Sequence, residues 1–252
     1  MPLPDLFLAP GFSSLLLTDS CSRYNLYGYP LTSSCTSCLY IGCAIANSSK
    51  IRNVSDKASI TEHIEVLKRW PGAGSQAVEK TPSVLAYDNE FTRVIAWGSS
   101  VGDQHKNQFA HFKLLLHRPA NRDSQNVDDL AWKLQATSIR SSSLPRGKTA
   151  VDVTADYLRP LYQYIQQILA NTYGEKFLAS QTLSYVITVP ALWSDRSKAL
   201  TQRAASEAGF NGKVMLVTEP EAAALYCATI CDEVDLRVGS KFLGTLFPHS
   251  GK

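Results

Sequence analysis

The chain has 252 residues, of which 44% are hydrophobic, and its formal net charge is +3. This length and apolar content suffice for a core of one large or two small domains, which excludes an intrinsically disordered chain. No run of lysine or arginine accompanies the small positive charge, so the sequence offers no electrostatic basis for binding nucleic acid or a membrane surface.

Residues 1–39 carry few structural signals. Their apolar stretch, 3–17, is interrupted by prolines, an aspartate and a glycine, follows no basic region and is too short to span a bilayer. The sequence therefore predicts neither a signal peptide nor a membrane anchor, and we expect a cytoplasmic location.

The six cysteines do not form a recognisable metal site. Cys35 and Cys38 make one Cys-x-x-Cys pair, but no second pair supplies the two further ligands that a structural zinc needs. Cys227 and Cys231 would lie one turn apart on a helix. We expect reduced thiols, as is usual in a cytosolic protein, and no metal held by the protein alone.

The first clear elements follow residue 64. Residues 64–70 favour a strand, and the Pro-Gly-Ala-Gly sequence at 71–74 predicts a loop. Residues 83–87 and 94–97 favour two further strands, joined by a polar turn at 88–90. We expect these two strands to form an antiparallel hairpin.

A Gly-x-Ser-x-Gly pattern comes directly after this hairpin, at residues 98–102. Placed after a strand, it could form the nucleophile elbow of a hydrolase. A hydrolase also needs an acid and then a histidine further along the chain, and after Leu116 only His117 and His249 remain. The pattern leaves a hydrolase as a minor alternative.

Two other enzyme-like patterns are weaker. Residues 147–149, Gly-Lys-Thr, resemble the end of a phosphate-binding P-loop, but Ser142 replaces the first glycine and no buried strand precedes it. His105, His111 and His117 recur every six residues, which places them on different faces of a helix and argues against a shared metal.

A surface excursion and a long helix come next. Polar residues dominate 118–148, which predicts the excursion. Residues 150–171 place apolar side chains at helical spacing, so they predict a helix with one broad buried face. Pro160 should kink this helix or mark its start.

The best-specified stretch follows. Residues 185–189 form a short β-branched run that Pro190 ends, as expected of a buried strand. Ser194 is a suitable N-cap for a helix through Ala208, and Gly209 suits the position after its last turn.

A second strand and helix complete this unit. Residues 214–217 favour another buried strand, and Glu219-Pro220 begins another helix with proline in its first turn. The order strand, helix, strand, helix predicts an α/β fold in which both strands share one sheet.

These last segments resemble a known family. VITVPALWSD, residues 186–195, and TEPEAAALYC, residues 218–227, are similar in order and spacing to two segments that line the ATP cleft of the 70-kilodalton heat-shock chaperones. Four earlier segments between residues 68 and 162 also resemble that family: KRWPGAG, KTPSVLAYD, IAWG and LPRGKTAVDVTADYLRPLY. The resemblance is greatest to the divergent branch without the usual peptide-binding domain.

The resemblance implies an α/β fold of the ribonuclease-H-like, actin-like ATPase kind, with essentially the first lobe present as a mixed sheet flanked by helices. On this basis we expect a poorly specified segment at 1–39 and a tail at 244–252. Between them, residues 40–243 would form a partial actin-like ATPase domain, comprising lobe I and the start of lobe II.

Four positions match functional residues of the family. By resemblance, Lys113 faces the nucleotide phosphates and Glu219 positions magnesium-bound or attacking water, so both would contact ATP with Mg²⁺ and serve catalysis. Pro190 matches a switch proline that relays the nucleotide state to neighbouring domains. Lys198 takes the place of the family's arginine, which keeps the charge but loses the planar, bidentate guanidinium.

Two phosphate-binding hairpins of the family are not recognisable. Residues 35–39 read Cys-Thr-Ser-Cys-Leu where the family has Asp-Phe-Gly-Thr-Thr, and residues 244–252 do not contain the second motif, Asp-Ala-Gly-Gly-Gly-Thr. Because the backbone N–H groups of such hairpins cradle phosphates, we expect weak ATP binding and impaired hydrolysis.

Two functional hypotheses remain open. The chain is either a heat-shock-70-like, nucleotide-binding and chaperone-like ATPase domain, with Lys113 and Glu219 as its remaining site residues, or a non-enzymatic truncated fragment. The fragment would act at most as a protein-interaction module, through an exposed lobe face near residues 220–231. The expected partners are thus ATP or ADP and a protein, without nucleic acid or membrane. A sugar kinase of the same fold is weaker, because no sugar-binding carboxylate is recognisable.

Overall fold

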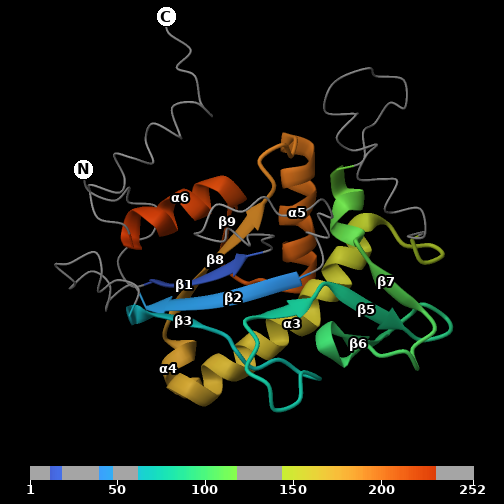
Figure 1. The fold of residues 1–252 in the computed structure, drawn as a ribbon, viewed down its shortest axis with the longest axis horizontal. Helices are drawn as coiled ribbons and strands as arrows, with labels where there is room; N and C mark the ends of the chain where they lie inside the picture. Colours follow the sequence, from blue (N-terminus) through green and yellow to red (C-terminus); the bar gives the residue numbers. More distant parts are fainter. Residues whose placement is uncertain (1–11, 19–39, 48–61, 118–143, 231–252) are drawn as a thin grey trace, which may run out of the picture.

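The structure, a computed structural model, describes residues 12–18, 40–47, 62–117 and 144–230. Two sheets organise these residues, a larger one of six strands and a smaller one of three (Figure 1). The larger sheet contains β1 (Phe12–Thr18), β2 (Tyr40–Asn47), β3 (Ile64–Val66), β4 (Lys80–Pro82), β8 (Thr182–Val189) and β9 (Lys213–Thr218). The smaller contains β5 (Val84–Tyr87), β6 (Val94–Trp97) and β7 (Gln108–Ala110).

The larger sheet is mixed, with the strand order β3-β2-β1-β8-β9 and with β4 also paired to β2. β1, β8 and β9 run parallel to one another, whereas β2 runs antiparallel to β1. The two strands that the sequence specified best, β8 and β9, share this sheet, as predicted. The expected burial of residues 214–217 holds only for Val217, because β9 is the last strand in the order and its other residues are partly exposed. The order and directions are those of a ribonuclease-H-like lobe and confirm the predicted fold class.

β8 is central because it is buried on both faces. Tyr185, Ile187 and Val189 belong to the main hydrophobic core, and Val186 and Thr188, on the opposite face, are buried as well. A strand covered on both sides needs a nearly continuous apolar run, which is the pattern that made it recognisable in the sequence.

Two helices pack against each other and share the core with β8. They are α3 (Ala150–Tyr173), which contributes the fully buried Leu161 and Ile165, and α5 (Asp195–Ala208), which contributes the fully buried Ala204 and Ala205. The third long helix, α6 (Glu219–Ile230), contacts β9 and β8 and lies on the other side of the sheet from α3 (Figure 1). The sheet is therefore covered on both faces.

The helix ends follow the sequence signals. Ser194 accepts a hydrogen bond from the Ser197 N–H at the start of α5, and Gly209 ends the helix with a left-handed φ of 100°. Thr149 and Asp152 form a capping box at the start of α3. The Gly-Lys-Thr tripeptide thus leads into a helix cap, in agreement with the rejection of a P-loop.

The predicted hairpin is confirmed, because β5 and β6 pair antiparallel. The strand expected at 64–70 is shorter, since β3 ends at Val66. β3 pairs only with residues 44–46 of β2, and β4 takes over the pairing at residues 40–42. Beyond Val66, Leu67 and Trp70 are buried, whereas Lys68 and Arg69 between them are exposed.

Two further expectations are resolved by the structure. Pro160 lies inside α3 and does not mark its start. It has no N–H to donate to the carbonyl of Asp156, but packing of the buried face of α3 compensates for this missing hydrogen bond.

The Gly-x-Ser-x-Gly pattern forms a single 3₁₀ turn, Gly98–Ser100, followed by extended Val101. Because a nucleophile elbow leads into a helix, the hydrolase alternative loses its structural basis.

β1 belongs to the segment in which the sequence predicted no element. Other sequence expectations lie outside the described residues: Cys35 and Cys38, the hairpin position 35–39, Cys231, most of the surface excursion, and residues 244–252. Across the described ranges, the helices are all too short or too polar to cross a membrane.

Candidate functional site

Three parallel strands end together at one edge of the large sheet. Leu17 of β1 pairs with Ile187 of β8, which in turn pairs with Leu216 of β9, so the carboxyl ends of these strands are level. In open α/β sheets, ligands bind outside the carboxyl ends of the strands. We therefore expect a ligand site among the segments that meet at this edge.

Lys113 reaches the site from a short 3₁₀ helix, η4 (Phe112–His117). Three buried apolar side chains, Phe112, Leu114 and Leu116, hold η4 in contact with α3 and α5. His111, directly before it, has a φ of 58°, a left-handed conformation that is uncommon for a residue other than glycine. This backbone turn leads the chain from β7 into η4 and brings Lys113, itself only 8% exposed, into the interior.

Glu219 reaches the site as the first residue of α6. The cap of α6 uses the carboxylate of Glu221, which accepts hydrogen bonds from the Thr218 hydroxyl at 2.7 Å and the Thr218 N–H at 2.9 Å. The bond from the Thr218 hydroxyl, and after it the bond from the Thr218 N–H, lowers the pKa of Glu221. Because Glu221 serves the cap, the neighbouring Glu219 can serve another contact.

That contact is with Lys113, which lies far away in the sequence. The Lys113 Nζ is 3.6 Å from Glu219 Oε1, and the two side chains are 10% and 29% exposed. The distance exceeds the ~2.7–2.9 Å of a charge-assisted hydrogen bond, so these two atoms attract without forming one. The structure thus brings together the two residues that the sequence predicted as the core of the site.

A tryptophan and a histidine that sequence analysis did not assign to the site lie beside this pair. The Lys113 Nζ is 5.5 Å from the ring centroid of Trp193, a cation–π contact, and Trp193 is buried. The His117 ring lies parallel to the same indole, at an interplanar angle of 1° and a centroid distance of 6.3 Å. No local pattern marks this contact; only the position of Trp193 within VITVPALWSD could have indicated it.

Pro190 lies on the connection between β8 and α5, and Lys198 lies in the first turns of α5; neither is part of the Lys113–Glu219 ion pair. The carbonyl of Pro190 accepts a hydrogen bond from the Trp193 N–H at 3.2 Å, which closes a turn between β8 and α5. Lys198 lies 3.8 Å from Asp195, whose side chain is fully exposed, so that ion pair is at the surface. After the hydrogen bonds from Thr218, the positive charge of Lys198 also lowers the pKa of Glu221, which lies in the first turn of α6.

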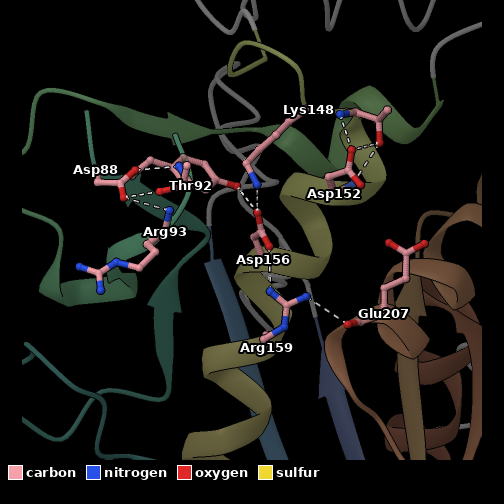
Figure 2. Close-up of polar contacts among 10 residues, drawn as sticks. Asp88, Thr92, Arg93, Lys148, Asp152, Asp156, Arg159 and Glu207 are labelled. Atoms are coloured by element: carbon pink, nitrogen blue, oxygen red, sulfur yellow. Dashed lines mark hydrogen bonds and ion pairs between the residues drawn. The ribbon is translucent and has the colours of Figure 1, made fainter. Parts of the chain in front are cut away.

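A second charged cluster surrounds Asp156 on α3 (Figure 2). Its carboxylate accepts hydrogen bonds from Lys148 at 2.6 Å, the Tyr87 hydroxyl at 2.7 Å and Arg159 at 2.8 Å. Arg159 also donates to the backbone carbonyl of Glu207 at 3.1 Å, which ties α3 to α5. Burial raises the pKa of Asp156, but the hydrogen bonds outweigh this and hold it below the ordinary 3.8. This cluster fastens secondary-structure elements together.

The Lys113–Glu219 pair has chemistry that fits part of a magnesium–nucleotide complex. An ammonium group suits a phosphate, and Mg²⁺ in nucleotide sites usually takes only one or two protein carboxylates together with phosphates and water. Within the described part of the chain, no group of three or more His, Cys, Asp and Glu side chains could hold a metal ion. A magnesium ion at Glu219 would therefore depend on the phosphates that accompany it.

The order and directions of the strands in the larger sheet are those of one lobe of the actin-like ATPase fold. A model of the family described as Hsp70 protein matches residues 70–228, and the chain belongs to this family.

Known relatives agree with this assignment. The chain is 27% identical over 186 residues to heat shock 70 kDa protein 12B of Homo sapiens, an alignment that covers 68% of this chain and 25% of the relative. It is 26% identical over 183 residues to heat shock 70 kDa protein 12A of Homo sapiens and of Mus musculus, covering 66% of this chain and 25% of each relative. The chain thus spans about a quarter of the length of the curated relatives it matches.

Proposed function

We propose that these residues form a nucleotide-binding lobe of the Hsp70 type, which contacts ATP or ADP with Mg²⁺ through Lys113 and Glu219. The observation that carries this proposal is the 3.6 Å approach of the two side chains at the carboxyl edge of the parallel strands. Membership of the Hsp70 family supports it, because the family resemblance gives both residues roles at the phosphates.

In this proposal, each residue has a separate task. Lys113 supplies a positive charge to the phosphates from a mostly buried position, where charges act more strongly than in water. Glu219 supplies a carboxylate for the magnesium ion or for a water molecule near the phosphates. The ion would neutralise charge on the phosphates when it is bound. Trp193 would limit the positions that the Lys113 ammonium can take.

We propose further that a polypeptide of these 252 residues binds ATP weakly and does not hydrolyse it at a chaperone-like rate. Removing one set of preorganised donors to a transition-state oxyanion costs about 10²–10³ in rate, and two phosphate-binding motifs are not recognisable in the sequence. With few contacts left, the dissociation constant for ATP should be on the order of millimolar or weaker.

Calorimetry with ATP and Mg²⁺, combined with a phosphate-release assay, tests this proposal. We expect millimolar or weaker binding, lost in Lys113→Ala, and no phosphate release that depends on Glu219. Micromolar affinity, or hydrolysis that disappears in Glu219→Ala, would show a working ATPase and contradict the proposed impairment. Binding that is unchanged in Lys113→Ala would contradict the proposed site.

A protein-interaction role is the second candidate, favoured by the state of α6. Its residues Ala223 and Leu225 are only partly buried, although α6 is an apolar helix. Partly exposed apolar surface favours a partner or self-association. A purified chain that is monomeric by sedimentation and binds no more hydrophobic dye than ordinary globular proteins would contradict this role.

We also propose a cytoplasmic location for the chain. Within the described ranges, Cys43 is a free and buried cysteine, which is compatible with a reducing compartment. Imaging of the tagged chain beside a cytoplasmic marker checks this proposal, and accumulation in another compartment would contradict it.

A further inference from the structure

His117 is held from two sides, although the proposed function gives it no role. Its ring is stacked on Trp193, and its Nδ1 lies 3.0 Å from the Oγ of the buried Ser197. The Ser197 Oγ lies 3.0 Å from the Oγ of Ser194, the residue that caps α5. Both anchors of the imidazole therefore come from the segment that follows Pro190.

His117 is also linked to Lys113 through two independent connections. The two residues belong to the same short helix, η4. In addition, both contact the indole of Trp193, His117 by stacking and Lys113 by a cation–π contact at 5.5 Å. A lysine side chain carries its ammonium on a flexible four-carbon stem, so a fixed aromatic surface beside it restricts where the ammonium can lie.

We propose that His117 is a positioning residue of the nucleotide site. It holds the Trp193 ring and the start of α5 against η4, and so keeps the Lys113 ammonium opposite Glu219. The inference rests on the proposed function of Lys113 and Glu219 as a nucleotide site, but the geometry that it invokes exists without nucleotide. Lys198, whose ion pair lies at the surface, has no such connection to the pair in the described structure.

The test measures Lys113 directly in the nucleotide-free protein. An amine-acylating reagent is added, and the modification rate of Lys113 relative to the exposed Lys68 is followed by peptide mass spectrometry. In parallel, the indole N–H signal of Trp193 is followed by nitrogen-15 NMR, after assignment with Trp193→Phe. We expect His117→Ala to raise the relative modification rate of Lys113 about threefold or more and to shift the Trp193 signal.

Three further variants separate positioning from general loosening. His117→Phe keeps a ring for stacking and should restore most of the Lys113 protection, whereas His117→Gln keeps only a hydrogen bond to Ser197 and should restore less. Ser180→Ala is the matched control, because the Ser180 hydroxyl donates to the Phe177 carbonyl away from the site, and it should change neither signal. If His117→Ala does not fold, His117→Gln takes its place in the comparison.

The outcomes distinguish this inference from the proposed function. A shifted Trp193 signal with unchanged Lys113 modification in His117→Ala would overturn the inference and leave His117 as a packing residue. Equal changes in His117→Phe and His117→Ala would also overturn it, because stacking would then be irrelevant. If Lys113 responds as expected but Lys113→Ala does not affect ATP binding, the positioning stands and the proposed nucleotide site fails.

Discussion

Two charged clusters of this lobe differ in how closely their members approach. Around Asp156, one carboxylate accepts three hydrogen bonds of 2.6–2.8 Å from three positively charged or hydroxyl groups. At the sheet edge, the Lys113 Nζ lies 3.6 Å from Glu219 Oε1. Both clusters lie partly out of water, since the side chains of Asp156 and Lys113 are 15% and 10% exposed.

The difference separates a structural cluster from a candidate binding site. A carboxylate that accepts several short hydrogen bonds has little capacity left for a ligand, and each bond adds to the cohesion of the fold. A lysine and a glutamate held near each other at a longer distance can exchange their mutual attraction for phosphate and magnesium at smaller cost. Burial alone therefore does not distinguish a structural charge from a functional one, since both clusters are partly buried.

The largest effect should come from Asp156→Ala. The substitution leaves Lys148, Arg159 and Tyr87 without their shared acceptor, and removing one partner of a largely buried cluster costs several kcal/mol. We expect the free energy of unfolding to fall by about 3 kcal/mol, measured by urea denaturation. Glu79→Ala is the control, since Glu79 pairs with Lys68 at 3.7 Å with both side chains exposed, and it should cost at most about 1 kcal/mol. Equal losses in the two variants would refute the distinction.

Lys113→Ala should show the opposite balance between stability and binding. We expect the free energy of unfolding to fall by less than in Asp156→Ala, because the Glu219 carboxylate left behind is 29% exposed and water can solvate it. Affinity for ATP with Mg²⁺ should fall about tenfold or more, equivalent to ~1.4 kcal/mol. Denaturation and ligand-titration NMR on one sample measure both quantities. A large stability loss with unchanged affinity would make the pair structural too.

Acid should weaken the Asp156 cluster. The folded-state pKa of Asp156 lies below its ordinary 3.8, so the unfolded chain binds protons more readily than the folded one. The stability that Asp156 contributes is therefore complete above the ordinary pKa of 3.8. It is lost as the pH falls through the lower pKa of the folded state. Urea denaturation at a series of pH values should show a flatter acid dependence for Asp156→Asn than for the unaltered chain. Parallel pH curves would rule out this contribution.

The smallest effect should come from Lys198→Ala. Its ion pair with Asp195 spans 3.8 Å at the surface, and such pairs contribute between about zero and 1 kcal/mol. We expect a stability change below about 0.5 kcal/mol and no change in ATP affinity. A clear loss of affinity would assign Lys198 a part in the site that the described contacts do not indicate.

Elements with a strong local signal were predictable from the sequence. Residues 185–189 were recognisable as a strand because β8 is buried on both faces and is followed directly by Pro190. The bounds of α5 could be predicted from Ser194 and Gly209. The Ser194 side chain accepts a hydrogen bond at the start of the helix, and Gly209 can adopt the left-handed conformation that ends it. The candidate site came from resemblance instead, since no spacing rule relates Lys113 to Glu219.

Features that depend on distant pairing were not predictable. β1 is a strand because β2 and β8 pair with both of its edges, and its own residues gave no clear alternation. The contact between His117 and Trp193 joins η4 to the turn after β8, so a search for regularly spaced histidines could not find it. The bond from Tyr87 to Asp156 likewise links β5 to α3.

The position of β1 also sets the order in which the chain can fold. β1 can pair with β2 early, but its other edge must wait for β8, which lies more than a hundred positions further along the chain. While a ribosome is still synthesising the intervening residues, that edge remains open to pairing with other chains. Closing such a distant parallel pair is slow because the loop entropy must be lost before the contacts form. Nascent chains of this protein should therefore depend on chaperones until β8 has emerged.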